Sequence, residues 1–525
     1  MKKIRLIKLA TLFFILSVNS FYVIYAQVIT SKEVDKLVER TLKTFEVPGI
    51  AVTIVKDGKV IHAKGYGVRS LNSNKKVDEH TLFAIASNTK AFTAATIGIL
   101  VDEGKLNWDD KVIDYIPEFR LYHSYVTEEF TIRDLLTHRS GLGLGAGDLM
   151  IFPDGSDFKI ENLIYNLRFL KSVSSFRSKF DYDNLLFIVA GEVVSRVTGM
   201  SWEAYVEERI MKPLEMDRSA GNFNRVKDKS NIADPHAPVD NKIIVVDRYD
   251  HELTSSAGAI YSSIHDMSKW AILQMNHGKY GERLSKKLFS EKVHEEMWTP
   301  QTILPVRGSN SYNTHFSAYG LGWSLSDVKG YKQISHTGGL PGMVTQVTLL
   351  PEMKLGIIVL TNQQSGSAFA SITNQIKDSY LDIQGTDRVK EYYERVQSNK
   401  ENIKKITDEV WKEIAENQKD TSVKVDLSLY TGTYKDDWFG EILISEKKNK
   451  LWFDSKRSPK LTGEMLFYKG NTFIVKWNDR SMDADAFVMF ELDYSGQASG
   501  IKMKAVSPLT DFSYDFHDLD FHVVK

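Results

Sequence analysis

Strand-like segments lie at the two ends of residues 31–380, and this placement constrains the fold more than any other feature of the sequence. Residues 49–67 predict two strands joined by a tight turn at Asp57–Gly58. The next strand-like runs lie between Tyr319 and Asn362, and helical patterns such as 185–197 and 202–210 occupy the interval. Strands from both ends can close into one sheet with the helices packed on it. We therefore expect an α+β domain with an antiparallel sheet.

The first 26 residues are organised like a secretory signal peptide. Four cations within residues 2–8 precede an apolar run over 9–26, and Ala26–Gln27 is the expected cleavage site. An uncleaved membrane anchor is the alternative, although Ser17, Asn19 and Ser20 inside the run favour cleavage. We therefore expect a periplasmic or secreted protein with no stable membrane span after cleavage. The mature chain would open with a helix over 31–45, capped by Ser31.

Charge argues against nucleic acid as a partner. Removing the four N-terminal cations leaves 63 basic and 68 acidic side chains, which is a net charge of −5. A chain without a basic field does not attract a polyanion. We therefore expect no nucleic-acid partner.

A change in amino-acid composition marks the end of the first domain. Seventeen of the 35 residues in 386–420 are charged, and the stretch contains neither Gly nor Pro. Its apolar residues recur every three or four positions, with one gap, which predicts an amphipathic linker helix. A break near Asn399 and a solvated linker without fixed structure are the alternatives. The apolar stripe comprises Val389, Tyr392, Val396, Ile403, Ile406, Val410 and Ile414.

The last hundred residues are rich in short strand-like runs separated by turns. Seven such runs lie between 441 and 519, and the last of them is SYDFHDL at 513–519. This pattern predicts a small closed barrel or sandwich. Trp438, Trp452, Phe453 and Trp477 are candidates for a ligand cavity, although aromatic residues at strand spacing are more often core. The expected organisation is a signal peptide at 1–26, an α+β domain at 27–385, a linker helix at 386–424 and a barrel at 425–525.

The chain contains no cysteine, which excludes thiol nucleophiles, zinc–thiolate sites and disulfide scaffolds. A hydroxyl nucleophile is left, and Ser87 is the best candidate. Ser87 and Lys90 open an apolar helix at i and i+3, so their side chains can meet on one face. A buried lysine loses its proton easily and can activate the serine. The alternative, in which Ser87 is a helix cap and Lys90 is solvated, remains open from this segment alone.

Two further segments carry polar groups suited to catalysis. Tyr182 and Asn184 precede an apolar helix, where a phenol can transfer protons and an amide can bind a substrate carbonyl. A core aromatic residue and a helix cap are the plainer interpretation of this pair. His336, Thr337, Gly338 and Gly339 follow a short strand, and small residues there allow a substrate to lie against it. The alternative is a glycine turn with an incidental histidine.

The three segments, in this order and about 95 and 150 residues apart, resemble the serine β-lactamase and penicillin-binding-protein superfamily. The Tyr-x-Asn form is that of class C β-lactamases and DD-carboxypeptidases, and residues 135–143 and 255–270 also resemble that group. The resemblance covers about residues 31–380 and implies a β-lactamase-like sheet flanked by helices, together with an all-helical subdomain. The C-terminal part resembles the lipocalin-like barrel appended to some of these hydrolases, including an archaeal self-compartmentalising serine peptidase. Three roles stay open for this domain: capping of the active-site cleft, restriction of substrate size, and homo-oligomer formation through the C-terminal domain.

The resemblance also implies roles for individual residues. Ser87 would be acylated, Lys90 would take its proton, and Tyr182 would protonate the leaving group and then activate water. Asn184 would orient the substrate amide, while the backbone N–H groups of Ser87 and Gly339 would bind the oxyanion. His336, Thr337 and Gly338 would line the far wall of the substrate-binding site. The resemblance implies no metal and no organic cofactor.

One position departs from the family pattern. His336 stands where β-lactamases carry lysine, and an ordinary histidine is mostly neutral at pH 7. The resemblance therefore implies a small-molecule or peptide substrate, and it gives D-amino-acid-containing peptides and esters more weight than β-lactams. A receptor that is acylated with little turnover is the other candidate function.

Overall fold

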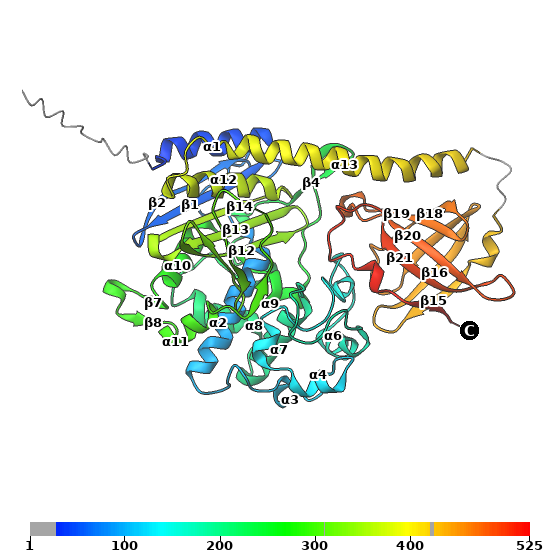
Figure 1. Cartoon of the computed structure of the whole chain (residues 1–525), viewed down its shortest axis with the longest axis horizontal. Coiled ribbons are helices and arrows are strands. Elements are labelled where there is room, and N and C mark those ends of the chain that lie inside the picture. The colour runs from blue at the N-terminus through cyan, green and yellow to red at the C-terminus, as the bar shows by residue number, and fades with distance from the viewer. Residues whose placement is uncertain (1–27, 309, 420–424, 525) are drawn as a thin grey trace, which may run out of the picture.

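A computed structural model of the chain describes residues 28–308, 310–419 and 425–524. The expected signal peptide and its cleavage site lie outside these residues. Within them, an α+β domain is followed by a long helix and a β-barrel, as Figure 1 shows. The predicted fold class is confirmed.

In the described part of the chain, one antiparallel sheet of eight strands organises the first domain. The N-terminal hairpin pairs with β14, so that Ile54 lies opposite Ile357 and strands from both ends of the domain meet. Helices of the intervening chain thereby come to lie against the same sheet. The strand order is β2 (Lys59–Gly67), β1 (Gly49–Lys56), β14 (Leu355–Thr361), β13 (Met343–Leu350), β12 (Tyr331–Leu340), β11 (Ser324–Val328), β10 (Ser317–Tyr319) and β9 (Thr302–Leu304).

Helices cover both faces of this sheet because its central strands are apolar on both sides. All seven residues of β14 are buried, as expected for a strand packed on two faces. Helices α1 (Ser31–Thr44) and α12 (Gly366–Tyr380) pack on one face. Helices α2 (Thr89–Asp102), α7 (Leu185–Thr198) and α10 (Ile264–Met275) belong to the core on the other. The predicted cap of α1 is off by one residue, since Thr30 forms the capping box with Glu33.

Shorter elements complete the domain. The helices are α3 (Val112–Tyr115), α4 (Ser124–Glu129), α5 (Ile132–Leu135), α6 (Ile160–Asn166), α8 (Trp202–Val206), α9 (Ser255–Gly258) and α11 (Glu291–Met297). Three small strand pairs are β3 (Phe83–Ala84) with β6 (Tyr261–Ser262), β4 (His236–Val239) with β5 (Lys242–Val245), and β7 (Lys279–Tyr280) with β8 (Lys286–Lys287). No single helix among the described residues is long and apolar enough to cross a membrane; only the bent pair 185–198 and 202–211 passes when taken together.

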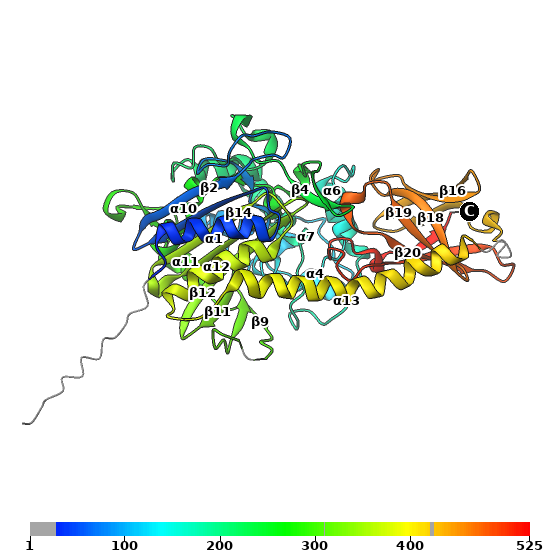
Figure 2. The same ribbon diagram turned by 90° about the horizontal axis from the view of Figure 1, so that it is seen from above.

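Helix α13 (Arg388–Asn417) joins the two domains without a break, so the alternative of a break near Asn399 is wrong. Its first part lies along α1 and α12, and the rest extends to the barrel (Figures 1 and 2). Val389 is buried against the α1–α12 side of the sheet, whereas Ile414 is buried with Ile474 and Val506 of the barrel. The apolar stripe therefore serves two surfaces, one at each end of the helix.

In the described residues the C-terminal domain is a closed barrel of eight antiparallel strands. Trp438, Phe453 and Trp477 are buried in its core, and the rings of Phe453 and Trp477 meet edge to face at 5.3 Å. One predicted strand is wrong, because residues 513–519 form a loop and a short 3-10 turn instead. The strands are β15 (Gly432–Asp436), β16 (Gly440–Lys447), β17 (Lys450–Ser455), β18 (Thr462–Lys469), β19 (Thr472–Trp477), β20 (Ala486–Leu492), β21 (Ala498–Ala505) and β22 (Phe521–Val523).

Candidate active site

Ser87 lies in a tight turn between strand β3 and helix α2. The turn, Ala86–Asn88, is a single 3-10 segment, and Ala86 adopts a left-handed φ of 49° that non-glycine residues rarely occupy. Such backbone strain is typical of functional sites. The turn leaves Ser87 partly exposed at the start of α2, while its neighbours Ala86 and Asn88 are buried.

Lys90 is fully buried beneath this turn, which rules out a solvated side chain. Its Nζ lies 3.1 Å from Ser87 Oγ, 2.8 Å from Asn184 Oδ1 and 2.9 Å from the carbonyl oxygen of Ala257. The nitrogen therefore has three oxygen neighbours, one of which is the candidate nucleophile. Ser87, Lys90 and Asn184, which lie up to 97 positions apart in sequence, form one connected cluster.

Burial changes the proton affinity of Lys90. Desolvation lowers its pKa to about 7, against the opposing influence of the carboxyl groups of Asp148 and Asp183. Those two side chains are themselves buried, which raises the pKa of Asp183 to about 7 and that of Asp148 well above its usual range. A lysine with a pKa near neutrality can accept the proton of a serine hydroxyl.

Tyr182 faces the same nitrogen from the other side of the cluster. Lys90 Nζ lies 4.9 Å from the centroid of the Tyr182 ring. Burial raises the pKa of the phenol, and the Ser87 hydroxyl opposes this only in part. Tyr182 is therefore a phenol at neutral pH, suited to giving a proton rather than to holding a negative charge.

His336 is buried on β12 with both ring nitrogens engaged. The Thr337 carbonyl oxygen lies 2.6 Å from Nδ1 and can only accept, so Nδ1 carries the proton, and Nε2 accepts from the Tyr319 hydroxyl at 2.9 Å. Burial, aided by Lys90, lowers the pKa of His336 to about 3. The ring is therefore neutral at pH 7 and supplies no cation to the far wall.

The two glycines after Thr337 differ in what surrounds them. A Cβ on Gly338 would lie 2.2 Å from the carbonyl oxygen of Ile85, so Gly338 allows β12 to pack against the chain that leads to Ser87. A Cβ on Gly339 meets no other described atom within 4 Å. Both glycines line the cleft in front of Ser87, but open space lies at Gly339, whereas Gly338 also packs closely against the backbone of Ile85.

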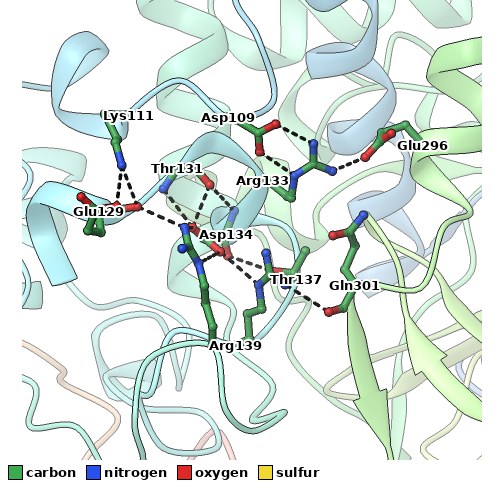
Figure 3. Close-up of polar contacts among 11 residues, drawn as sticks. Asp109, Lys111, Glu129, Thr131, Arg133, Asp134, Thr137, Arg139, Glu296 and Gln301 are labelled. Atoms are coloured by element: carbon green, nitrogen blue, oxygen red, sulfur yellow. Dashed lines mark hydrogen bonds and ion pairs between the residues drawn. The ribbon is translucent and has the colours of Figure 1, made fainter.

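Asp134 lies at the centre of a cluster of ion pairs and hydrogen bonds just before His138 (Figure 3). Asp134 is fully buried and accepts from the Nε atoms of Arg139 and Arg177, each at 3.0 Å. Four residues after Asp134, His138 accepts the backbone N–H of Asp183 on Nδ1 at 3.0 Å. The cluster therefore fixes the backbone between Tyr182 and Asn184. Residues 135–143 carry part of the family resemblance, but the resemblance implied no role for His138.

The cleft in front of Ser87 has a volume of about 560 Å³, and both domains line it. The first domain contributes all of the predicted site residues except Lys90, which lies beneath the floor. The barrel contributes residues from three of its connections, whereas the sequence left open whether this domain caps the cleft. The barrel residues are Lys460, Asp479, Ser481, Met482, Asp511, Phe512, Ser513 and Tyr514.

Comparisons with known proteins agree with this architecture. The model of the Beta-lactamase family matches residues 34–381, and a Domain of unknown function (DUF3471) matches residues 416–522. The chain is 28% identical over 447 residues to Unguisins hydrolase ungD' of Aspergillus campestris, covering 81% of this chain and 79% of that protein. It is 27% identical over 374 residues to Protein flp of Staphylococcus aureus strain N315, covering 67% and 70% respectively.

A solved structure shows the same fold over both domains. The octameric penicillin-binding protein homologue from Pyrococcus abyssi superposes with a TM-score of 0.59 at 22% identity, covering 88% of this chain and 97% of that one. The family match includes the sheet, its helices and the Ser87 cluster. The chain therefore belongs to the beta-lactamase family of serine hydrolases, and its C-terminal domain is a DUF3471 barrel.

Proposed function

We propose that this protein hydrolyses small amides or esters through an acyl-enzyme on Ser87, and that D-amino-acid-containing peptides are its main substrate class. The observation that carries the proposal is the 3.1 Å approach of the buried Lys90 amine, whose pKa is lowered to about 7, to Ser87 Oγ. A serine hydroxyl is a weak nucleophile and needs such a base.

In the acylation step, Ser87 Oγ would attack the substrate carbonyl and pass its proton to Lys90 Nζ. The carbonyl oxygen would become an oxyanion held by the N–H groups of Ser87 and Gly339. The bond to the leaving amine or alcohol would then break. The proton held by Lys90 would reach that leaving group through the Tyr182 hydroxyl, whose raised pKa keeps it protonated.

In the deacylation step, water would attack the acyl carbon and release Ser87. Tyr182 would pass the proton of the water to the neutral amine of Lys90, and that proton would return to Ser87 Oγ as the acid leaves. Asn184 would hold the acyl amide in place throughout. The whole cycle would use proton transfer among three side chains.

The wall of the cleft that contains His336 favours substrates that carry no carboxylate next to this residue. His336 is neutral because its pKa is lowered to about 3, so it offers no cation in the place where β-lactamases carry lysine. Peptide amides and esters fit such a wall better than β-lactams. The hydrolase name of the Aspergillus relative supports bond hydrolysis as the reaction.

A receptor that is acylated with little turnover is the second candidate. The observation that favours it is the raised pKa of Tyr182, which leaves little phenolate to activate the deacylating water. A carboxylesterase on the same site is a variant of the first proposal. Homo-oligomer formation through the barrel is proposed by analogy with the octameric Pyrococcus protein.

Intact-mass measurement tests these alternatives together. The protein would be exposed to a panel of D-amino-acid amides, short-chain esters and β-lactams, with Ser87→Ala as the control. A mass increase on the wild type that decays within minutes supports the hydrolase, and a stable stoichiometric adduct supports the receptor. Turnover retained by Ser87→Ala would refute both.

A further inference from the structure

The barrel domain reaches the catalytic cluster through a short segment, 511–515, between β21 and β22. Ser513 is buried, and its Oγ donates to Oδ2 of Asp148 at 2.9 Å. Asp148 belongs to the first domain and follows Gly147 in a 3-10 turn. A hydroxyl of the C-terminal domain thus contacts a fully buried carboxyl group beneath the active site.

A chain of hydrogen bonds continues from Asp148 to the candidate base. The same oxygen, Oδ2 of Asp148, accepts from Asn184 Nδ2 at 2.7 Å, and Asn184 Oδ1 accepts from Lys90 Nζ at 2.8 Å. An amide has a donor end and an acceptor end, so an acceptor at Asp148 fixes which end faces Lys90. The other oxygen, Asp148 Oδ1, has no partner among the described residues, so Asn184 and Ser513 are what hold this carboxyl group.

The backbone around Asp148 is held by the same barrel segment. The carboxylate of Asp515 accepts the N–H of Gly147 at 2.6 Å and that of Leu149 at 3.0 Å, one on each side of Asp148. Gly145 has a φ of +71°, and a Cβ there would lie 2.7 Å from the carbonyl oxygen of Phe512. These contacts set the position of the turn, and Ser513 sets the orientation of its side chain.

We propose that Ser513 of the barrel domain is a positioning residue for the catalytic centre, acting through Asp148 and Asn184 on the amine of Lys90. The inference rests on the proposed function, since it assigns to the barrel a share in holding the base of that reaction. The barrel is then an integral part of the active site rather than an independent appended module.

The charged and titratable groups around Lys90 determine how its pKa responds to loss of the Ser513 hydrogen bond. Lys90 is faced by Asp148, Asp183, Tyr182, His138 and His336. The Ser513 hydrogen bond lowers the pKa of Asp148, although burial dominates and raises it. Losing that bond raises the pKa of Asp148 further, so less negative charge supports the ammonium form of Lys90. The pKa of Lys90 then falls, and the acid limb of activity moves to lower pH.

The test compares Ser513→Ala with Ser507→Ala in the full-length protein. Ser507 lies in the same connection, but its Oγ accepts from Leu509 within the barrel, so it is a matched control. Steady-state hydrolysis of p-nitrophenyl acetate gives kcat, KM and the pH profile. The rate of adduct formation with a fluorophosphonate, followed by intact mass, reports the reactivity of Ser87 separately. Thermal unfolding checks that both variants are folded.

For Ser513→Ala we expect kcat and the adduct rate to fall about tenfold, which is the usual effect of losing one buried hydrogen bond. KM should stay within about twofold because the Ser513 hydroxyl is bonded to Asp148, although the residue lines the cleft, and the acid limb should move to lower pH. Ser507→Ala should match the wild type. If Ser513→Ala behaves like Ser507→Ala, or raises KM with kcat unchanged, the inference is wrong. If the wild type itself forms no adduct, the proposed function fails instead.

Discussion

Replacing Lys90 by Met tests the central chemical assignment. Met is unbranched and apolar and close to Lys in length, so it removes the amine while filling the same buried space. Without the base, Ser87 loses its activation, and we expect kcat/KM to fall by about 10²–10⁴. The wild type should lose about tenfold in kcat/KM for each pH unit below about 7, where Lys90 becomes protonated, and Lys90→Met should not show this limb.

The stability of the same variant can be worked out from the structure. Folding lowers the pKa of Lys90 from 10.5 to about 7, so the folded chain binds fewer protons between these values. Stability therefore rises with pH in that window, and below pH 7 the buried amine destabilises the fold by about 5 kcal/mol. Methionine removes that penalty but leaves three oxygen neighbours without their donor, at about 1–2 kcal/mol each. The free energy of unfolding at pH 7 should thus stay within about 2 kcal/mol of the wild type.

Two assays read out this prediction. Hydrolysis of p-nitrophenyl acetate between pH 5 and 9 gives the rate profile, and urea unfolding at pH 7 gives stability. Loss of activity in a protein of near wild-type stability is the expected result. The reasoning is refuted if Lys90→Met keeps more than about a tenth of wild-type kcat/KM, or if the wild-type profile has no limb near pH 7.

Four further predictions follow from individual residues. Tyr182→Phe should slow deacylation by at least about 10²-fold, so that acyl-enzyme accumulates in mass spectra; unchanged turnover would remove Tyr182 from the mechanism. Gly338→Ala should lower the free energy of unfolding by about 1–3 kcal/mol, because the new Cβ would lie 2.2 Å from the carbonyl oxygen of Ile85. Gly339→Ala should change it by less than about 0.5 kcal/mol. Equal effects of the two substitutions in urea unfolding would contradict the packing role of Gly338. Burial raises the pKa of Asp134, but its arginine and threonine partners lower it more, so its contribution to stability is present above about pH 4 and is lost on acidification. Asp134→Asn should therefore lower the free energy of unfolding by about 3–5 kcal/mol at pH 7. A smaller loss of stability at pH 7 than at pH 3 would contradict this pH dependence. Protein recovered outside the cytoplasm should begin at Gln27 by intact mass, and a chain that keeps residues 1–26 there would contradict signal cleavage.

The sequence by itself determined the elements that local patterns encode. The turn at Asp57–Gly58 between two strand-like runs predicted the first hairpin, and the apolar stripe predicted α13, because turn chemistry and helical period act over a few residues. The absence of cysteine and the i, i+3 spacing of Ser87 and Lys90 directed attention to a hydroxyl nucleophile with a lysine base. The resemblance supplied the expected roles of Tyr182 and Asn184.

Only the tertiary structure decided how the site is supported. Burial, which no local pattern reveals, lowers the pKa of Lys90 to about 7 and that of His336 to about 3. The space around a Cβ at each position separates the close packing of Gly338 from the open space at Gly339. The segment 513–519 is the last of the strand-like runs in the C-terminal sequence, but it forms no strand. In the fold it leaves the barrel, and Ser513 binds Asp148, 365 positions earlier in the chain. Such a contact depends on how two domains pack, and sequence periodicity carries no information about partners at that separation.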